Sequence, residues 1–250
     1  MHYNLLFNGC SFTKGSELQG KTKDFEYRRI NRFSHIISEK TNKTYANIAE
    51  GGSSNDCIVR STIEWFEAGN TCDLAIIQLT HISRIEFISR YAARPVNFSP
   101  KRIVLSPQEM AENKKDAIDI RESNIIYYRH VYNDNLGFYN FYKNLFILEQ
   151  YLEKNNIKYF FLKLTGNGKS IYPEQEENLC WGSCCKHTYL SIPSINTTIL
   201  DMNNKNYCTK DYSSEGYSML NGKHPNELGH QKIAEYLIQE IKSQNIFNAL

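Results

Sequence analysis

The sequence predicts an α/β protein of three layers, in which a parallel sheet lies between two layers of helices. Short apolar runs alternate along the chain with amphipathic stretches of helical period, as expected for strands joined by crossover helices. Two of these runs, at residues 72–80 and 157–165, have the composition of strands that are buried on both faces. The length of 250 residues, 41% of them apolar, suits one domain with a well-buried core.

The first part of the chain contains three predicted strands and two predicted helices. Residues 3–8 form the first strand and residues 43–49 a short second strand. Residues 27–41, between them, form an amphipathic helix. Residues 53–70 form a helix with a serine cap, an acidic first turn and a glycine near its end, and residues 72–80 form the third strand. The apolar face of the first helix consists of Ile30, Phe33, Ile36 and Ile37.

The second part continues the alternation. Residues 138–156 form a long helix, and residues 157–165 form a buried strand. Residues 196–202 form the last strand and residues 226–244 the last helix. The apolar positions of the long helix are Phe138, Phe141, Leu145, Leu148 and Leu152.

Two segments fit this alternation poorly, at about residues 90–136 and 165–196. Loops of this length are uncommon in compact domains unless they have a function of their own. The chain contains no internal repeat and no low-complexity linker. The sequence therefore predicts a single domain, residues 1–250, with two insertions.

The charge and the apolar pattern argue against several classes of partner. The net charge is +2, with no basic block, so we expect no nucleic acid as partner. No apolar run approaches the roughly 20 residues of a membrane span, and the first residues lack the pattern of a signal peptide. We expect a cytoplasmic protein, with attachment to a virus particle as the alternative. Seven cysteines in such a chain do not predict a disulfide framework.

Three polar, glycine- or serine-containing segments follow predicted strands, at residues 8–15, 50–56 and 78–84. In parallel sheets the ligand lies beyond the carboxyl ends of the strands. Ser11 in the first segment is either a helix-capping serine or a nucleophile. A serine nucleophile needs a neighbouring base, and His224, directly before Pro225 and the predicted helix cap Asn226, is the candidate.

This order of motifs resembles the SGNH (GDSL-type) hydrolase family over essentially the whole chain. Residues 9–15, Gly-Cys-Ser-Phe-Thr-Lys-Gly, correspond to the family's Gly-Asp-Ser-x-x-x-Gly block. Residues 221–225, Asn-Gly-Lys-His-Pro, correspond to its Asp-x-x-His-Pro block. Asn47 and Gly52 match the Asn-x-x-x-x-Gly spacing of its second block. The resemblance implies the SGNH hydrolase fold, with a parallel, flavodoxin-like central sheet.

The resemblance also implies a mechanism and a substrate class. Ser11 would attack an ester carbonyl while His224 takes its proton, with Asn221 in the orienting position. The backbone N–H groups of Ser11 and Gly52 would form the oxyanion hole. We expect a small acyl ester, in particular an acetyl ester, on a carbohydrate or similar small molecule. No metal or organic cofactor is expected.

The sequence departs from the family pattern at two of these positions. The third block of the family ends in Gly-x-Asn-Asp, and Ile82 stands where its asparagine is expected. Asn221 stands where the orienting aspartate is expected, so that Asp201, Asp211 or a backbone carbonyl could orient His224 instead. The side chains that could replace the missing donor or bind substrate are Asn55, Thr80, His81 and Ser83.

These departures leave two alternatives to the esterase open. One is an inactive SGNH-like protein that binds a ligand or is a structural component of a virus particle. The other is an acyltransferase that uses the same residues with water excluded. Arg84 is a further candidate for substrate binding, with an ion pair to Glu50 or Glu86 as its simpler explanation.

Some residues outside these motifs also allow two interpretations. Trp181 and the tyrosines 127, 128 and 132 lie in the insertions and could stack on a sugar or an acyl chain. His230, inside the last helix, is expected to be structural. One cluster of metal-ligand types would either bind zinc or belong to a reduced insertion. It consists of Cys180, Cys184, Cys185, His187 and Cys208.

Overall fold

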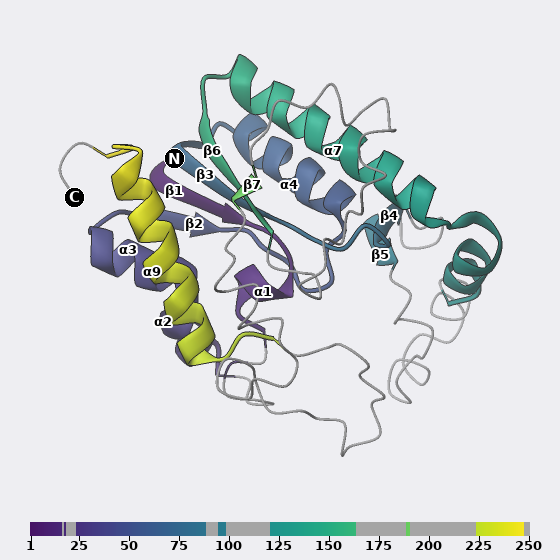
Figure 1. The fold of residues 1–250 in the computed structure, drawn as a ribbon, viewed down its shortest axis with the longest axis horizontal. Coiled ribbons are helices and arrows are strands. Elements are labelled where there is room, and N and C mark those ends of the chain that lie inside the picture. The colour runs from purple at the N-terminus through teal and green to yellow at the C-terminus, as the bar shows by residue number, and fades with distance from the viewer. Residues whose placement is uncertain are drawn as a thin grey trace.

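The computed structural model describes residues 1–16, 18, 24–88, 95–98, 121–163, 189–190 and 224–247. At its centre is a five-stranded parallel sheet with the strand order β2-β1-β3-β6-β7 (Figure 1). This is the 2-1-3-4-5 order of flavodoxin-like sheets, so the predicted fold class is confirmed. The strands are β1 (His2–Asn8), β2 (Tyr45–Asn47), β3 (Thr71–Leu79), β6 (Lys158–Lys163) and β7 (Tyr189–Leu190).

Helices cover both faces of the sheet and complete the three layers (Figure 1). One face carries α3 (Phe33–Thr41) and α9 (Glu227–Ser243), with α2 (Phe25–Asn31) beside them. The other face carries α4 (Asn55–Glu67) and α7 (Asp134–Lys154). None of the helices that the structure describes has the length and hydropathy of a membrane span.

The alternation of side chains along the strands divides the apolar core between the two faces. Leu5 and Phe7 of β1 point towards α3 and α9, whereas Leu6 between them points towards α4 and α7. All three side chains are fully buried, and each contributes roughly 1.5–3 kcal/mol relative to an exposed position. Strands buried on both faces need the continuous apolar runs seen in the sequence.

The strand register brings three loops to one edge of the sheet. Phe7 near the end of β1 pairs with Asn47, which ends β2, and with Ile76 near the end of β3. Because the strands are parallel, the segments that follow them leave the sheet on the same side. This is the arrangement expected for a ligand site.

One predicted helix is two helices in the structure. Residues 27–41 are interrupted at Arg32, whose backbone is extended (φ −80°, ψ 148°), and α3 starts at Phe33. The Phe33 N–H donates to the buried Nδ1 of His230 on α9 at 3.2 Å instead of continuing the helix of α2. The break leaves Ile30 41% exposed, so its predicted place on the apolar face was wrong.

The long helix α7 starts before the predicted boundary, at Asp134, because the Asn133 side chain accepts a hydrogen bond from the Leu136 N–H. Residues 134–136 of the segment predicted as the first insertion therefore belong to α7. The other described parts of that segment include β5 (Pro95–Phe98), a helical stretch at residues 121–126 and one π-helical turn, η1 (Tyr127–Val131). Strand β5 pairs antiparallel with β4 (Ile85–Ile88), which directly precedes this segment.

The last part of the sheet differs from the predicted pattern. The strand that pairs with β6 in the structure is β7, which lies inside the predicted second insertion. The last strand predicted at residues 196–202 lies outside the described residues. The single domain with two insertions stays a prediction.

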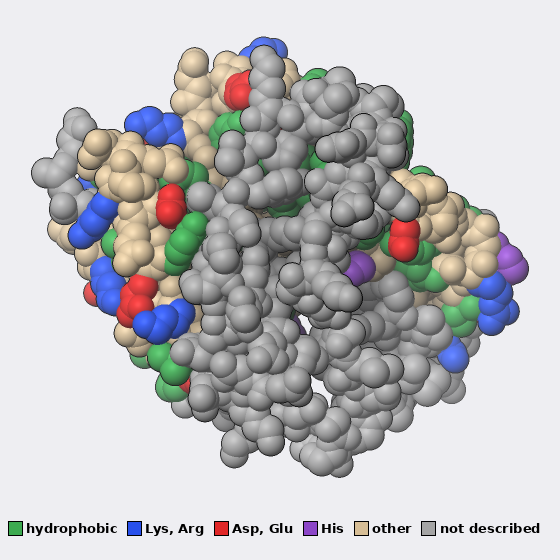
Figure 2. Space-filling model, viewed as in Figure 1, with side chains coloured by type: hydrophobic (Ala, Val, Ile, Leu, Met, Phe, Trp, Pro, Cys, Tyr) green, Lys and Arg blue, Asp and Glu red, His purple; other side chains and the backbone are tan. Residues whose placement is uncertain are grey.

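On the face drawn in Figure 2, described Lys and Arg side chains are interspersed with Asp and Glu.

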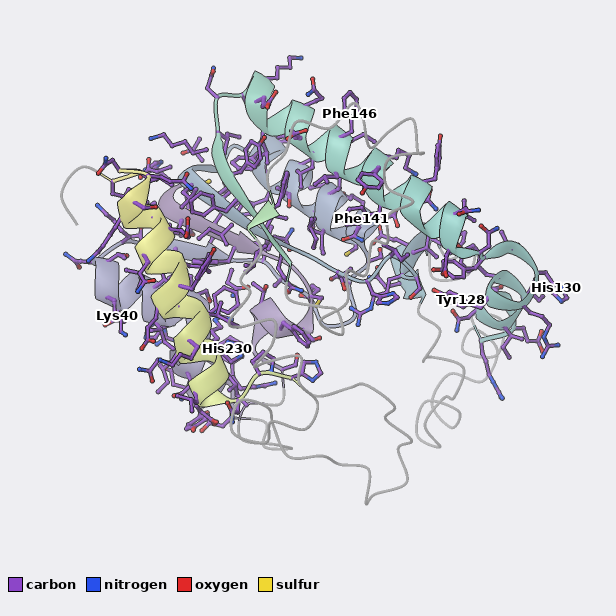
Figure 3. All side chains as sticks on the ribbon, in the orientation of Figure 1. Lys40, Tyr128, His130, Phe141, Phe146 and His230 are labelled. Carbon is purple, nitrogen blue, oxygen red and sulfur yellow. The ribbon has the colours of Figure 1, made fainter. Side chains whose placement is uncertain are left out.

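His230 is the one fully buried histidine of the described residues and lies on α9 (Figure 3). Its ring stacks on that of Phe33, with a centroid distance of 5.7 Å. Burial, reinforced by the neighbouring His224 and Arg32 side chains, lowers the pKa of His230 to about 3. The folded state therefore holds this imidazole neutral at all but the lowest pH.

We predict that His230 lowers the stability of the folded protein in acid. An unfolded histidine binds a proton near pH 6.5, whereas folded His230 does so only near pH 3. Between these values the free energy of unfolding should fall by about 1.4 kcal/mol per pH unit on account of this residue. In His230→Asn the asparagine can still accept the Phe33 N–H but does not titrate. Urea unfolding at pH 6.5 and 4.5 should therefore show a smaller fall in the free energy of unfolding for this variant than for the wild type. Equal losses in both proteins would contradict the prediction.

Candidate active site

Ser11 lies at the first of the three loops. Strand β1 ends at Asn8, and after Gly9 and Cys10 the chain enters the short helix α1 (Ser11–Lys14). Cys10 is extended (φ −101°, ψ −157°), and Gly15 ends α1 in the left-handed region at φ 75°. Ser11 is 9% exposed, so the residue is mostly buried but is not closed off from solvent. The turn therefore presents Ser11 at the carboxyl edge of the sheet.

Two buried amide side chains, Gln78 and Asn8, hold this turn, and neither was predicted from the sequence to do so. Gln78 of β3 accepts hydrogen bonds through Oε1 from the Cys10 N–H at 3.2 Å and from the Thr13 hydroxyl at 2.8 Å. Its Nε2 donates to the Leu79 carbonyl at 3.2 Å. Gln78 thus joins the end of β3 to both ends of the turn. A glutamine inside an apolar strand run was the available signal, because a buried polar group needs partners.

Asn8 makes the corresponding connection to α4. Its Nδ2 donates to the Ile58 carbonyl at 3.1 Å and to the Thr62 hydroxyl at 2.8 Å. Its Oδ1 accepts from the Gly9 N–H at 2.8 Å. The turn before Ser11 is therefore fastened on one side to β3 and on the other to α4.

Gly9 is required because the backbone passes directly against Gln78. A Cβ at position 9 would lie 2.7 Å from the Gln78 Cβ and 2.6 Å from the Thr13 Oγ1. The Gln78 Cβ belongs to a central strand and cannot move away cheaply. A larger residue would push the turn, and Ser11 with it, off the sheet.

The structure brings His224 to Ser11 across 213 positions of the chain. The His224 Nε2 lies 2.8 Å from the Ser11 Oγ, a distance that fits a neutral imidazole accepting the serine proton. The His224 ring packs edge-on against Phe12, with a centroid distance of 5.2 Å. Pro225 is buried, and Asn226 caps α9 by accepting from the Gly229 N–H at 2.9 Å, as the sequence predicts.

Asn221, the predicted orienting residue, lies outside the described residues, as do Asp201 and Asp211. Their relation to His224 stays a prediction.

The second loop is tied to α1. The Asn47 Nδ2 donates to the Thr13 carbonyl at 3.0 Å and to the Ser34 hydroxyl at 2.8 Å. The Glu50 N–H donates to the Gly9 carbonyl at 3.3 Å. Gly52, two residues on, adopts φ 82° in the left-handed region that favours glycine. The loop is thus held beside the Ser11 turn, and the oxyanion role of Gly52 stays a prediction.

Most of the predicted side chains of the second and third loops bind one another. Asn55 uses both amide atoms on Thr80: Oδ1 accepts from the Thr80 N–H at 2.9 Å and Nδ2 donates to its carbonyl at 3.1 Å. The His81 Nδ1 lies 2.7 Å from the Ser83 hydroxyl. Ile82 is 7% exposed and belongs to the apolar core between the sheet, α4 and α7. Its side chain carries no donor, as the sequence departure implies.

Cys10, in the aspartate position of the first block, is fully buried and has an unusual electrostatic environment. Burial acts to raise the pKa of its thiol. The positive charge of Arg84 and hydrogen bonds from Phe12, Gln78 and Thr80 outweigh burial, so that the pKa lies below its ordinary value. The positive field at the third loop therefore extends to the residue preceding Ser11.

The three tyrosines of the first insertion pack on one another. The ring centroids of Tyr127, Tyr128 and Tyr132 are separated by 5.0–6.1 Å. The Tyr128 hydroxyl (labelled residue in Figure 3) donates to the Ser83 carbonyl. Through Tyr128 this cluster contacts the third loop. That these tyrosines stack on a substrate stays a prediction.

The zinc interpretation cannot be followed in the structure, because Cys180, Cys184, Cys185, His187 and Cys208 lie outside the described residues, as does Trp181. Among the residues that are described, no three His, Cys, Asp or Glu side chains are grouped as a metal site.

No protein-family model matches the sequence, and no curated protein matches it. Solved structures of similar fold include a lipolytic protein of the G-D-S-L family from Desulfitobacterium hafniense. It is 13% identical, with a TM-score of 0.49, and the match covers 94% of this chain and 98% of the other.

Two acetyl xylan esterases are also similar. The enzyme from Butyrivibrio proteoclasticus is 13% identical, with a TM-score of 0.46, and the match covers 98% of this chain and 65% of that longer one. A catalytic mutant of the enzyme from Geobacillus stearothermophilus is 12% identical, with a TM-score of 0.44, covering 96% and 94% of the two chains. The fold class itself rests on the sheet order and the helix layers described above.

We predict that Gly9→Ala destabilises the protein by about 1–3 kcal/mol, as expected for overpacking against a rigid strand. Gly51→Ala is the matched control in the second loop. A Cβ there meets only the Ser16 Oγ at 3.8 Å, an ordinary contact. Urea unfolding should show the loss for Gly9→Ala and a change within about 0.5 kcal/mol for Gly51→Ala. A Gly9→Ala protein as stable as the control would show that Gln78 does not confine the turn.

Proposed function

We propose that this chain is a divergent SGNH hydrolase and acts as a serine esterase. The preferred substrate is a small acyl ester, in particular an acetyl ester on a carbohydrate or similar molecule. The observation that supports this most strongly is the 2.8 Å contact between the Ser11 Oγ and the His224 Nε2. The two residues come from opposite ends of the chain and meet where parallel α/β sheets hold their ligands.

In the proposed reaction the Ser11 Oγ attacks the ester carbonyl while the His224 Nε2 takes its proton. The oxyanion forms beside the backbone N–H groups of Ser11 and Gly52. When the tetrahedral intermediate collapses, the imidazolium gives its proton to the leaving alcohol, and an acyl-Ser11 ester remains. His224 then takes a proton from a water molecule, whose oxygen attacks the acyl carbonyl. As the second tetrahedral intermediate collapses, the imidazolium returns this proton to the Ser11 Oγ and the carboxylic acid is released.

The apolar Ile82 sets a limit on the expected rate. The loss of one oxyanion donor typically lowers the rate about a hundred- to a thousand-fold. If no other group of this chain replaces the donor, we expect turnover well below that of a site with three donors. An inactive protein that binds its ligand with the same loops is the alternative that the buried Ile82 favours.

The proposal predicts that hydrolysis of 4-nitrophenyl acetate depends on both residues. Ser11→Ala and His224→Ala should each lower kcat by about a thousand-fold or more, because nucleophile and base act as one unit. His130→Ala is the matched histidine control, since His130 is exposed on η1 (Figure 3). It should keep the wild-type rate. Hydrolysis that survives in Ser11→Ala, or a folded wild-type protein without any activity, would contradict the esterase and favour the binding protein.

A further inference from the structure

Arg84 is a partly buried cation that is fixed at the edge of the candidate site. Its Nη1 donates to the Ser53 carbonyl at 3.2 Å and to the Thr80 hydroxyl at 3.0 Å. These two bonds use both hydrogens of Nη1. They leave the Nε–Nη2 edge of the guanidinium without a hydrogen-bond partner among the described residues. This edge presents two parallel donors, the geometry that matches a planar carboxylate.

The carboxylates that could neutralise Arg84 are bound elsewhere. Glu86 forms a two-point ion pair with Arg60, with both distances 2.8 Å. Glu50 is paired with Lys14 at 2.7 Å. Asp56 accepts hydrogen bonds from the Asn144 amide and the Glu86 N–H. The ion pair expected from the sequence, with Glu50 or Glu86, is therefore not formed, and no other described carboxylate lies within 4 Å of Arg84.

The anchoring of Arg84 places its charge next to the catalytic groups. Ser53, whose carbonyl it binds, directly follows Gly52 of the expected oxyanion hole. Thr80, whose hydroxyl it binds, directly follows β3, whose Gln78 accepts a hydrogen bond from the Cys10 N–H. The Cys10 Sγ lies 3.9 Å from the Ser11 Oγ. The guanidinium is thus attached to both loops that flank Ser11 and is held in one orientation.

We propose that the Nε–Nη2 edge of Arg84 binds a carboxylate of the substrate, so that the site prefers acetyl esters of acidic molecules, such as O-acetylated sugar acids. This inference rests on the proposed esterase function and names its substrate class. A partly buried charge is normally paired, and the substrate supplies the missing partner. A neutral ester would leave the guanidinium without an anion and would be held less firmly beside Ser11.

Two matched esters test the preference: 4-acetoxybenzoate and its neutral counterpart 4-acetoxybenzamide. Both release phenols of the same shape. The acetate ester of the benzamide is inherently the more easily hydrolysed of the two, because its phenol is the better leaving group. Faster cleavage of 4-acetoxybenzoate would therefore not be due to intrinsic reactivity. For the wild type we expect kcat/KM to be about ten- to a hundred-fold higher for the carboxylate, the range of charge-assisted hydrogen bonds. Sodium chloride should reduce this ratio by screening.

Variants of two arginines separate recognition from general stability. Arg84→Gln should bring the ratio close to one, and Arg84→Lys should keep part of it, because the charge remains without the two-donor edge. Arg29→Gln is the control, since the Arg29 guanidinium is already paired with Glu26 within α2. It should keep the wild-type ratio. A wild-type ratio near one, or an Arg84→Gln protein that loses activity on both esters equally, would overturn the proposal.

The failure of the esterase itself can be recognised separately. Hydrolysis of the neutral ester reports the proposed function alone, whereas the ratio of the two esters reports the role of Arg84. If neither ester is cleaved, binding of 4-acetoxybenzoate and 4-acetoxybenzamide to Ser11→Ala, measured by calorimetry, decides the role of Arg84. The role of Arg84 would be supported if Ser11→Ala binds 4-acetoxybenzoate more tightly than 4-acetoxybenzamide and the double variant Ser11→Ala/Arg84→Gln does not. Equal binding of the two compounds to Ser11→Ala would reject it.

Discussion

The buried amide of Gln78 is the constraint on which the site depends. A central strand must bury this polar group between two apolar layers, and an unsatisfied amide there would cost about 1–3 kcal/mol. The turn after β1 satisfies it through the Cys10 N–H and the Thr13 hydroxyl. The same bonds fix where α1 begins and so where Ser11 points. Gly9 follows from this constraint, because any side chain there would occupy the place of Gln78.

His224 reaches Ser11 through an independent part of the core. It lies directly before α9, whose start is set by the Asn226 cap and whose position is set by packing on α3 and the sheet. His230, one turn into α9, accepts the Phe33 N–H that begins α3. The nucleophile is thus positioned by the sheet and the base by a helix pair. Their 2.8 Å contact results from two rigid pieces, which suits a site that needs preorganisation.

The sequence alone predicted the features that depend on periodicity and local capping. The four longer parallel runs and the last helix with its Asn226 cap were visible in it. The order of the motifs, and not periodicity, indicated Ser11 and His224 as candidates for one site. The break at Arg32 was not, because it depends on the hydrogen bond that the Phe33 N–H donates to His230 of α9, 197 residues away. Gln78 does not stand out in the sequence, because it interrupts an apolar run by only one residue. The partners of Arg84 could not be chosen from sequence, because Glu50 and Glu86 bind other cations only in the folded chain.

The central claim is that His224 activates Ser11 as a nucleophile. The most direct measurement is the intact mass of the protein after reaction with a fluorophosphonate, followed by peptide mapping, for the wild type and for Ser11→Ala. We predict one adduct on the wild type, on the peptide that contains Ser11, and none on Ser11→Ala. A folded wild-type protein that takes up no adduct, or an adduct that persists in Ser11→Ala, would contradict the account.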